Sequence, residues 1–212
     1  MAEKPVFIPS GEINLEARLG RADSSRGAVV AHPHPLYGGS MHDYVVGIAV
    51  SALAEAGWTT LRFNFRGVGQ SGGTFDNGKG ETEDLAAAAA YLKNNGASRL
   101  LVAGYSFGAA IAVQAWAGLK ALGVMPLVLI APPAAFMSFD FMSPETEIGL
   151  IVCGGQDSIA PPDMARQLGQ RLRRPVEPVV IPGADHFFGG RQQELSSALG
   201  SYLQELNGPS GP

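Results

Sequence analysis

The segment from residue 100 to residue 113 constrains the fold of this chain more than any other stretch. It reads LLVAGYSFGAAIAV, an apolar run followed by a Gly-x-Ser-x-Gly pentapeptide and an alanine-rich run. The first run predicts a buried strand and the last predicts a helix. Gly104 and Gly108 bracket the turn because the two backbones approach too closely there for side chains. We therefore expect Ser106 at the apex of a strained turn, with its hydroxyl group above a sheet.

The same turn predicts a site for developing negative charge. A helix that begins after Ser106 directs its unpaired N–H groups and the positive end of its dipole toward the serine hydroxyl. Five-residue matches of this kind also arise by chance. The predicted strand before this match and the predicted helix after it make it more specific than the five residues alone.

Length and composition indicate a globular protein. The chain has 212 residues, of which 46% are hydrophobic and 16% charged, enough for a full core. We expect one domain over residues 1–206 and a flexible tail over residues 207–212. The formal net charge is −4 and the sequence holds no basic cluster, which argues against nucleic acid as a partner.

The sequence also bears on location. No apolar run reaches about 18 residues, so we expect no membrane span. The N-terminal stretch MAEKPVFIPSGE carries charges and lacks the long apolar core of a secretory signal. A single cysteine, Cys153, excludes an internal disulfide and fits a reducing compartment. It lies in an apolar run, so we expect a small buried side chain rather than a nucleophile. From these features we expect a cytoplasmic protein.

Hydrophobic periodicity predicts an α/β architecture. Alternation over residues 5–19 predicts an antiparallel hairpin with one solvated face. Beyond it, continuous apolar runs alternate with amphipathic helices, which is typical of a parallel sheet covered on both faces. Strands are expected at 28–31, 58–65, before Ser106, and at 126–131, 147–153 and 176–181. Helices are expected at 43–56, from a cap at Thr82 to about 95–96, from Ser106 to about 117, and at 161–172 and 192–206.

Polar residues follow several of these predicted strands, at the edge where such sheets bind ligands. They are His32, Arg66, Ser106, Asp157 and His186. A serine hydroxyl is a poor nucleophile without a base, and a histidine base needs a third group to fix its tautomer. The chain order Ser106, Asp157, His186 supplies these three groups from three loops.

Alternative readings of the nearby residues are weaker. Asp163 is a rival acid but falls inside a predicted helix, and Asp185 adjoins His186 and could orient it only through backbone distortion. His32 and His34 are a poor metal site because their side chains diverge in an extended, proline-stiffened loop and no third ligand is spaced nearby. Arg66 is better suited to tie the glycine-rich loop to neighbouring carbonyls or carboxylates than to contact substrate.

With these residues in place, the sequence resembles an α/β-hydrolase over nearly its whole length. GYSFG at 104–108 matches the nucleophile elbow, Asp157 the acid position and His186 the base position. HPHPLYGG at 32–39 and NFRGVGQS at 64–71 resemble a small lidless bacterial branch. The resemblance implies a three-layer α/β/α sandwich with a mostly parallel eight-stranded sheet, an antiparallel second strand and no separate cap domain.

The resemblance also implies an oxyanion hole. The N–H of Phe107 supplies one donor, and the loop after the strand at 28–31 should supply the other. Pro33 and Pro35 have no N–H, which leaves His34 or Leu36. The family's usual His-Gly-x pattern favours His34, but this loop departs from that pattern, so Leu36 stays open.

The substrate pocket is expected to be shallow and open. Capped α/β-hydrolases insert a lid after the strand that ends here at Ala131, and residues 132–147 are too few for one. The pocket walls are expected to come from Leu36, Tyr37, Phe107, Phe136, Met137 and Phe187, although for any single one of these side chains core packing is the more common role.

These features predict a serine hydrolase that cleaves small, short-acyl carboxylic esters through an acyl-enzyme, without a cofactor. A thioesterase, amidase or peptidase would use the same groups. A binding protein on this fold is the other class, and the three filled catalytic positions argue against it. Both monomer and homodimer stay open, because the 176–181 edge strand or the last helix could pair two copies.

Overall fold

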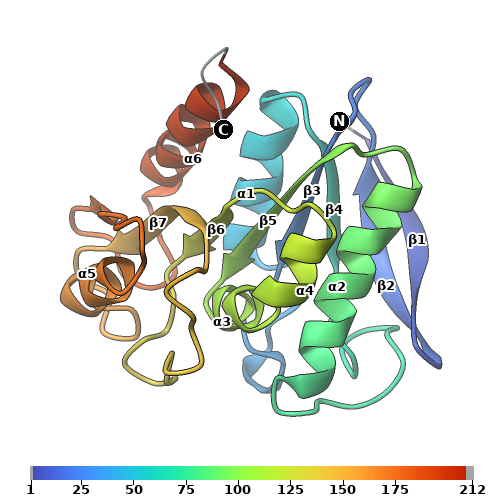
Figure 1. Ribbon diagram of the computed structural model, residues 1–212, viewed down its shortest axis with the longest axis horizontal. Helices are drawn as coiled ribbons and strands as arrows, with labels where there is room; N and C mark the ends of the chain where they lie inside the picture. Colours follow the sequence, from blue (N-terminus) through green and yellow to red (C-terminus); the bar gives the residue numbers. More distant parts are fainter. Residues whose placement is uncertain (1, 209–212) are drawn as a thin grey trace.

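The apolar runs of the sequence form the strands of one mixed β-sheet in the computed structural model, which describes residues 2–208 (Figure 1). Within that range, eight strands lie in the order β1-β2-β4-β3-β5-β6-β7-β8. Strand β2 is antiparallel to both of its neighbours, and the pairs from β4 to β8 are parallel. This confirms the predicted sheet and its antiparallel second strand.

The elements fall close to their predicted ranges. The strands are β1 (Glu3–Ser10), β2 (Ile13–Gly20), β3 (Arg26–Ala31), β4 (Thr59–Phe63), β5 (Arg99–Tyr105), β6 (Leu127–Ile130), β7 (Ile148–Gly154) and β8 (Val179–Ile181). The helices are α1 (Tyr44–Glu55), α2 (Lys79–Asn94), α3 (Phe107–Gln114), α4 (Trp116–Ala121), α5 (Pro162–Gln170) and α6 (Gln192–Asn207), with a 3-10 turn, η1 (Pro35–Tyr37). Strand β8 is shorter than predicted. The predicted tail begins at the last residue of α6, and residues 209–212 lie outside the described range.

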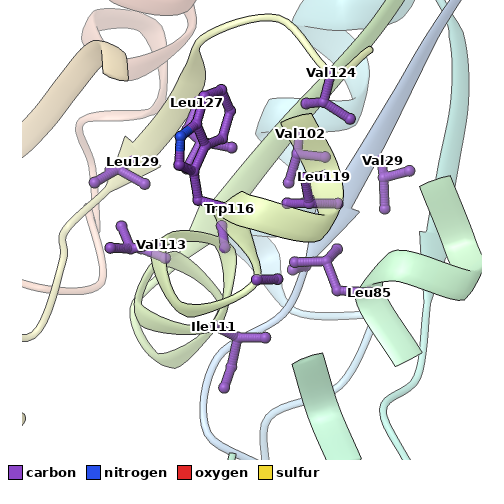
Figure 2. Packing of buried hydrophobic residues seen from close by; sticks show 14 of the residues in the cluster. Val29, Leu85, Val102, Ile111, Val113, Trp116, Leu119, Val124, Leu127 and Leu129 are labelled. Atoms are coloured by element: carbon purple, nitrogen blue, oxygen red, sulfur yellow. The ribbon is translucent and has the colours of Figure 1, made fainter. Parts of the chain in front are cut away.

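Side chains alternate between the two faces of the central strands and build two separate cores. Val29 and Val102 belong to the cluster covered by α2, α3, α4 and α5, part of which is drawn in Figure 2. Their neighbours Val30 and Ala103 belong to the cluster covered by α1 and α6. The period-two alternation of a strand thus explains the three layers. Each fully buried aliphatic side chain stabilises the fold by roughly 1.5–3 kcal/mol relative to its exposed state.

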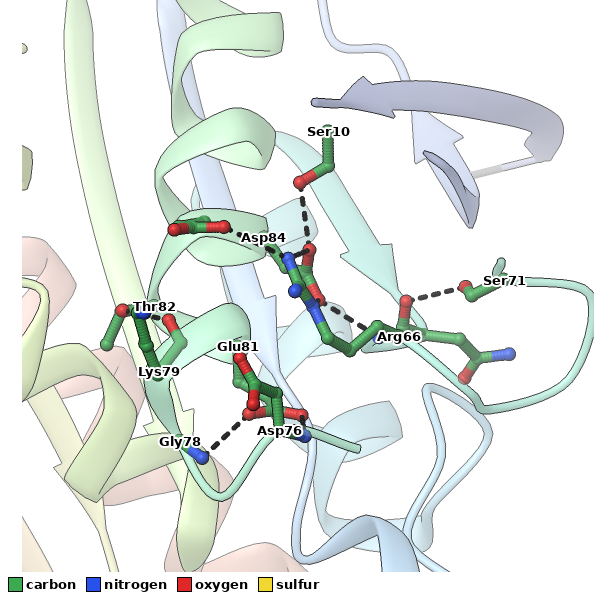
Figure 3. Close-up of polar contacts among 11 residues, drawn as sticks. Ser10, Arg66, Ser71, Asp76, Gly78, Lys79, Glu81, Thr82 and Asp84 are labelled. Atoms are coloured by element: carbon green, nitrogen blue, oxygen red, sulfur yellow. Dashed lines mark hydrogen bonds and ion pairs between the residues drawn. The ribbon is translucent and has the colours of Figure 1, made fainter. Parts of the chain in front are cut away.

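The start of α2 corrects one prediction. Thr82 does not cap this helix, because the helix begins three residues earlier, at Lys79, and the Thr82 hydroxyl donates to the Lys79 carbonyl. Glu81 holds the N-terminus instead: its carboxylate accepts the N–H groups of Gly78 at 2.7 Å and Asp76 at 2.9 Å (Figure 3). A buried glutamate at the third helical position thus does what a cap side chain would do.

An ion pair ties the loop after β4 to α2, as predicted for Arg66. Its Nε and Nη2 donate to the two carboxylate oxygens of Asp84 at 3.0 and 2.9 Å, and its backbone N–H also donates to Asp84 (Figure 3). The hydroxyl of Ser10 on β1 donates to the same carboxylate at 2.8 Å. Asp84 is fully buried, and these bonds satisfy its charge.

The connection from β6 to β7 leaves the carboxyl edge of the sheet uncovered. As the structure describes residues 131–147, they form turns without a helix or strand, in agreement with the predicted lack of a separate cap domain. Among residues 2–208, no helix has the length and apolar character needed to span a bilayer.

Candidate active site

The turn between β5 and α3 holds Ser106 in a strained conformation. Its φ is 54° and its ψ is −117°, a left-handed region that L-residues avoid. A Cβ at Gly104 would collide with the backbone oxygen of Gly108, and a Cβ at Gly108 would meet the backbone of Ala31. The two glycines therefore let β5, α3 and β3 approach closely enough to force the turn, as the sequence predicts.

A continuous line of hydrogen bonds joins the three residues chosen from the sequence. His186 lies in the loop after β8, and its Nε2 is 2.9 Å from the Ser106 hydroxyl. Its Nδ1 is 2.8 Å from Oδ2 of Asp157, which follows β7. All three side chains are buried. In the tautomer with the proton on Nδ1, the imidazole accepts the serine proton on one side and donates to the carboxylate on the other.

The loop after β7 fixes the carboxylate that faces His186. Oδ1 of Asp157 accepts the N–H groups of Ile159 at 2.8 Å and Ala160 at 2.7 Å, which leaves Oδ2 for the imidazole. The rival acids lie elsewhere: Asp163 is exposed and pairs with Arg166 on α5, and Asp185 accepts the N–H of Phe187.

Tyr105 supports His186 in a way that sequence reasoning missed. Its hydroxyl donates to the His186 backbone carbonyl at 3.1 Å, and the two rings lie 5.5 Å apart. Burial raises the pKa of this phenol far above its usual value, and nearby carboxylates, Asp43 first among them, raise the pKa further. The hydroxyl therefore stays a donor and ties the histidine loop to the end of β5. A tyrosine that ends an otherwise apolar strand is the sequence signal for such a contact.

The backbone N–H groups of Phe107, the first residue of α3, and of His34 have no partner among the described residues. Both residues line the same cavity as Ser106, and their rings lie 4.7 Å apart. Leu36 departs from its expected place: its N–H donates to Nδ1 of His34 at 3.2 Å, and its exposed side chain does not line the cavity around Ser106. Burial lowers the pKa of His34, which favours the neutral ring that accepts this bond.

His32 joins the ends of two strands. Its Nε2 accepts the N–H of Phe65 at 3.0 Å, and its Nδ1 lies 2.6 Å from the carbonyl oxygen of Pro33. The side chain is fully buried, and burial lowers its pKa from 6.5 to about 4. Both ring nitrogens have protein partners, so the neutral imidazole shapes the loop that carries His34.

A cavity of about 620 Å³ opens above Ser106. Apolar and aromatic side chains form most of its wall, and they include five of the six residues expected from the sequence: Tyr37, Phe107, Phe136, Met137 and Phe187. Three of these rings project into solvent, with exposures of 87% for Tyr37, 74% for Phe136 and 62% for Phe187. The remaining wall includes residues not expected from the sequence: Pro33, Gly38, Gly39, Asp43, Tyr105, Pro133 and Ile159.

Comparisons with known proteins identify relatives of this chain. Residues 28–143 match a family model described as serine aminopeptidase, S33. An uncharacterized protein of Rickettsia prowazekii is 38% identical over 210 residues, covering 93% of this chain and 87% of that protein. An α/β serine hydrolase homologue from Coxiella burnetii is 36% identical with a TM-score of 0.86, covering 96% of this chain and 98% of that one. A Xanthomonas campestris α/β serine hydrolase described as lacking a lid is 33% identical with a TM-score of 0.83, covering 99% and 97% of the two chains.

Proposed function

This chain belongs to the serine aminopeptidase S33 family and to the lidless branch of the α/β serine hydrolases, and from this premise we propose that it hydrolyses small carboxylic esters through an acyl-enzyme. The observation that carries the proposal is the line of hydrogen bonds from Asp157 through His186 to Ser106, at the base of an open cavity. A serine so placed can lose its proton as its oxygen attacks a carbonyl carbon.

In the proposed acylation step, Nε2 of His186 takes the proton from Ser106 while the serine oxygen bonds to the ester carbon. The carbonyl oxygen becomes an oxyanion, and the unpartnered N–H groups of Phe107 and His34 are the donors available to bind it. His186 then gives the proton to the departing alkoxide, which leaves as an alcohol. Asp157 holds Nδ1–H throughout and stabilises the transient imidazolium.

Deacylation reverses these roles. Water enters the open cavity, His186 removes its proton, and the resulting attack on the acyl carbon passes through a second oxyanion at the same donors. Collapse of that intermediate returns the proton to Ser106 and releases the carboxylic acid. Every group in this sequence comes from the chain or from water, so the proposed reaction uses no cofactor.

The shape of the cavity supports short acyl chains. Phe136 and Phe187 line the cavity with exposed rings, and the connection from β6 to β7 forms turns without a helix or strand to cover them. An acyl group that fits below these rings exchanges water for apolar contact, whereas a longer chain extends into solvent and gains little. We therefore expect acetate and butyrate esters to have a higher kcat/KM for each carbon of the acyl chain than octanoate esters.

The test is hydrolysis of the p-nitrophenyl esters of acetate, butyrate and octanoate by wild type and Ser106→Ala. Wild type should turn over the two short esters, and the variant should lose at least about 10⁴-fold in kcat. A Ser106→Ala protein that keeps the wild-type rate would refute the proposed nucleophile. Faster turnover of an acetyl or butyryl thioester than of the matched ester would move the substrate class to thioesters. Tight binding of esters without turnover would identify a binding protein.

A further inference from the structure

Asp43 is an acidic residue in a largely apolar wall. Of the described residues that line the cavity, it is the only aspartate or glutamate, and none is a lysine or arginine. Asp43 precedes α1, and its Oδ1 accepts the N–H of Val45 at 2.8 Å as a helix cap. No described group donates to its Oδ2, so half of this carboxylate is available to a ligand.

Asp43 shares its cavity with aromatic side chains. Tyr105, the neighbour of Ser106, lines the same cavity, and after burial the Asp43 charge is the next cause that raises the pKa of its hydroxyl group. Exposed rings of Tyr37 and Phe187 line the same cavity. Aromatic faces attract alkylammonium groups through their quadrupole, and a carboxylate in the same cavity adds direct charge attraction. A small number of placed polar groups in a largely apolar wall is the usual way a small-molecule cavity sets the orientation of its ligand, and Asp43 is the one carboxylate among those that the described residues supply.

We propose that this cavity contains a subsite for an organic cation, in which Asp43 and the aromatic rings that line the same cavity select esters that carry an alkylammonium group in their acyl or alcohol part. The inference rests on the proposed ester hydrolysis for its kinetic consequences but not for the binding of the cation itself. Cationic esters are then the preferred substrate class, and Asp43 is the residue that determines this specificity.

A helix cap alone does not require this charge. Asparagine caps helices about as well as aspartate because its side-chain oxygen accepts the same N–H. Asp43→Asn therefore keeps the bond to Val45 and removes only the charge. An attractive charge at a partly exposed site should change recognition by roughly three- to tenfold, and salt should weaken the effect because exposed charges are screened.

The kinetic test compares esters that differ only in charge. On the alcohol side the pair is butyrylcholine and neohexyl butyrate, in which carbon replaces the quaternary nitrogen. On the acyl side the pair is the p-nitrophenyl ester of γ-trimethylammoniobutyric acid and its carbon isostere. Wild type should favour the cationic member of at least one pair in kcat/KM, and Asp43→Asn should lower that preference roughly three- to tenfold. A general loss of activity cancels in the ratio.

Asp185→Asn is the matched control. Asp185 also caps a backbone N–H, that of Phe187, and also lies near Tyr105, but it does not line the cavity. This variant should keep the wild-type preference. An equal loss of preference in both variants would show a diffuse field rather than a subsite, and an unchanged preference in Asp43→Asn would overturn the proposal.

A binding test separates this inference from the proposed hydrolysis. Ser106→Ala, titrated calorimetrically with butyrylcholine and neohexyl butyrate, should bind the cation more tightly, and Ser106→Ala with Asp43→Asn should lose that difference. If wild type hydrolyses no ester while the cation preference in binding persists, the proposed function fails and the subsite stands. If hydrolysis is found but both proteins bind the two esters equally, the subsite fails and the proposed function stands.

Discussion

Replacing His32 by glutamine should make the folded state less sensitive to acid. The imidazole of His32 is fully buried, and its Nε2 accepts the N–H of Phe65. Protonation would put a second N–H donor against that amide, in a site without water contact. Burial therefore lowers the pKa of His32 from 6.5 in a solvated chain to about 4 in the folded protein.

The sign and size of the effect follow from these two values. Between pH 6.5 and pH 4, the unfolded chain binds a proton at His32 that the folded chain does not bind. The free energy of unfolding must therefore fall as the pH falls through this window, and its contribution from His32 is complete above pH 6.5. At about 1.4 kcal/mol for each pH unit, the full loss is about 3 kcal/mol. This is a large share of the stability of an ordinary domain, which is about 5–15 kcal/mol.

Urea unfolding at several pH values between about 7 and 4.5 measures this loss directly. Carboxylates also titrate below about pH 5, so the informative quantity is the difference between wild type and His32→Gln. At neutral pH the variant should be about 2 kcal/mol less stable, because glutamine cannot reproduce both hydrogen bonds of the ring. That difference should shrink as the pH falls, reach zero at about pH 5 and reverse slightly below it. Parallel curves for the two proteins would refute the neutral buried imidazole.

Three further substitutions test the supports of the site and the fold. Tyr105→Phe removes the hydroxyl bond to the His186 carbonyl and should lower kcat on p-nitrophenyl butyrate about tenfold with little change in KM. Asp84→Asn leaves the guanidinium of Arg66 without its buried partner and should cost about 3 kcal/mol in urea unfolding. Gly104→Ala forces a Cβ into the backbone of Gly108, so it should cost at least about 2 kcal/mol and abolish ester hydrolysis in the remaining folded protein.

Sequence reasoning succeeded where local constraints leave little choice. The glycines around Ser106 are required because the backbones of neighbouring elements contact them. Apolar runs of strand length are best buried as strands of a covered sheet. Because parallel strands end at one edge of a sheet, residues that follow separate strands meet there, which is how Asp157 and His186 reach Ser106 from sites 51 and 80 positions away. The choice of Asp157 over Asp163 needed only the expected start of α5.

It failed where the outcome depends on contacts between distant segments or on backbone detail. Thr82 has the side chain of a cap, but Glu81 reaches the turn before α2 and starts the helix earlier. Leu36 is a candidate oxyanion donor from the sequence, but in the 3-10 turn its N–H donates to the His34 ring. The place of Asp43 in the cavity depends on how α1 packs beside β5, which no local pattern states.

Because the cavity has no lid, solvent reaches the residues that could select its substrate. A lid would exclude water and strengthen every charge interaction beneath it, so that one carboxylate could dominate recognition. Here the rings of Tyr37 and Phe136 remain in contact with solvent, and the field of Asp43 is partly screened. The buried hydrogen bonds of Asp157 and His186 are shielded from that solvent by the protein itself. The hydrogen bonds of Asp157 and His186 can therefore stay strong while the attraction of Asp43 for a cation is weakened by solvent. For this reason the selectivity expected from Asp43 is of the order of tenfold and not thousands.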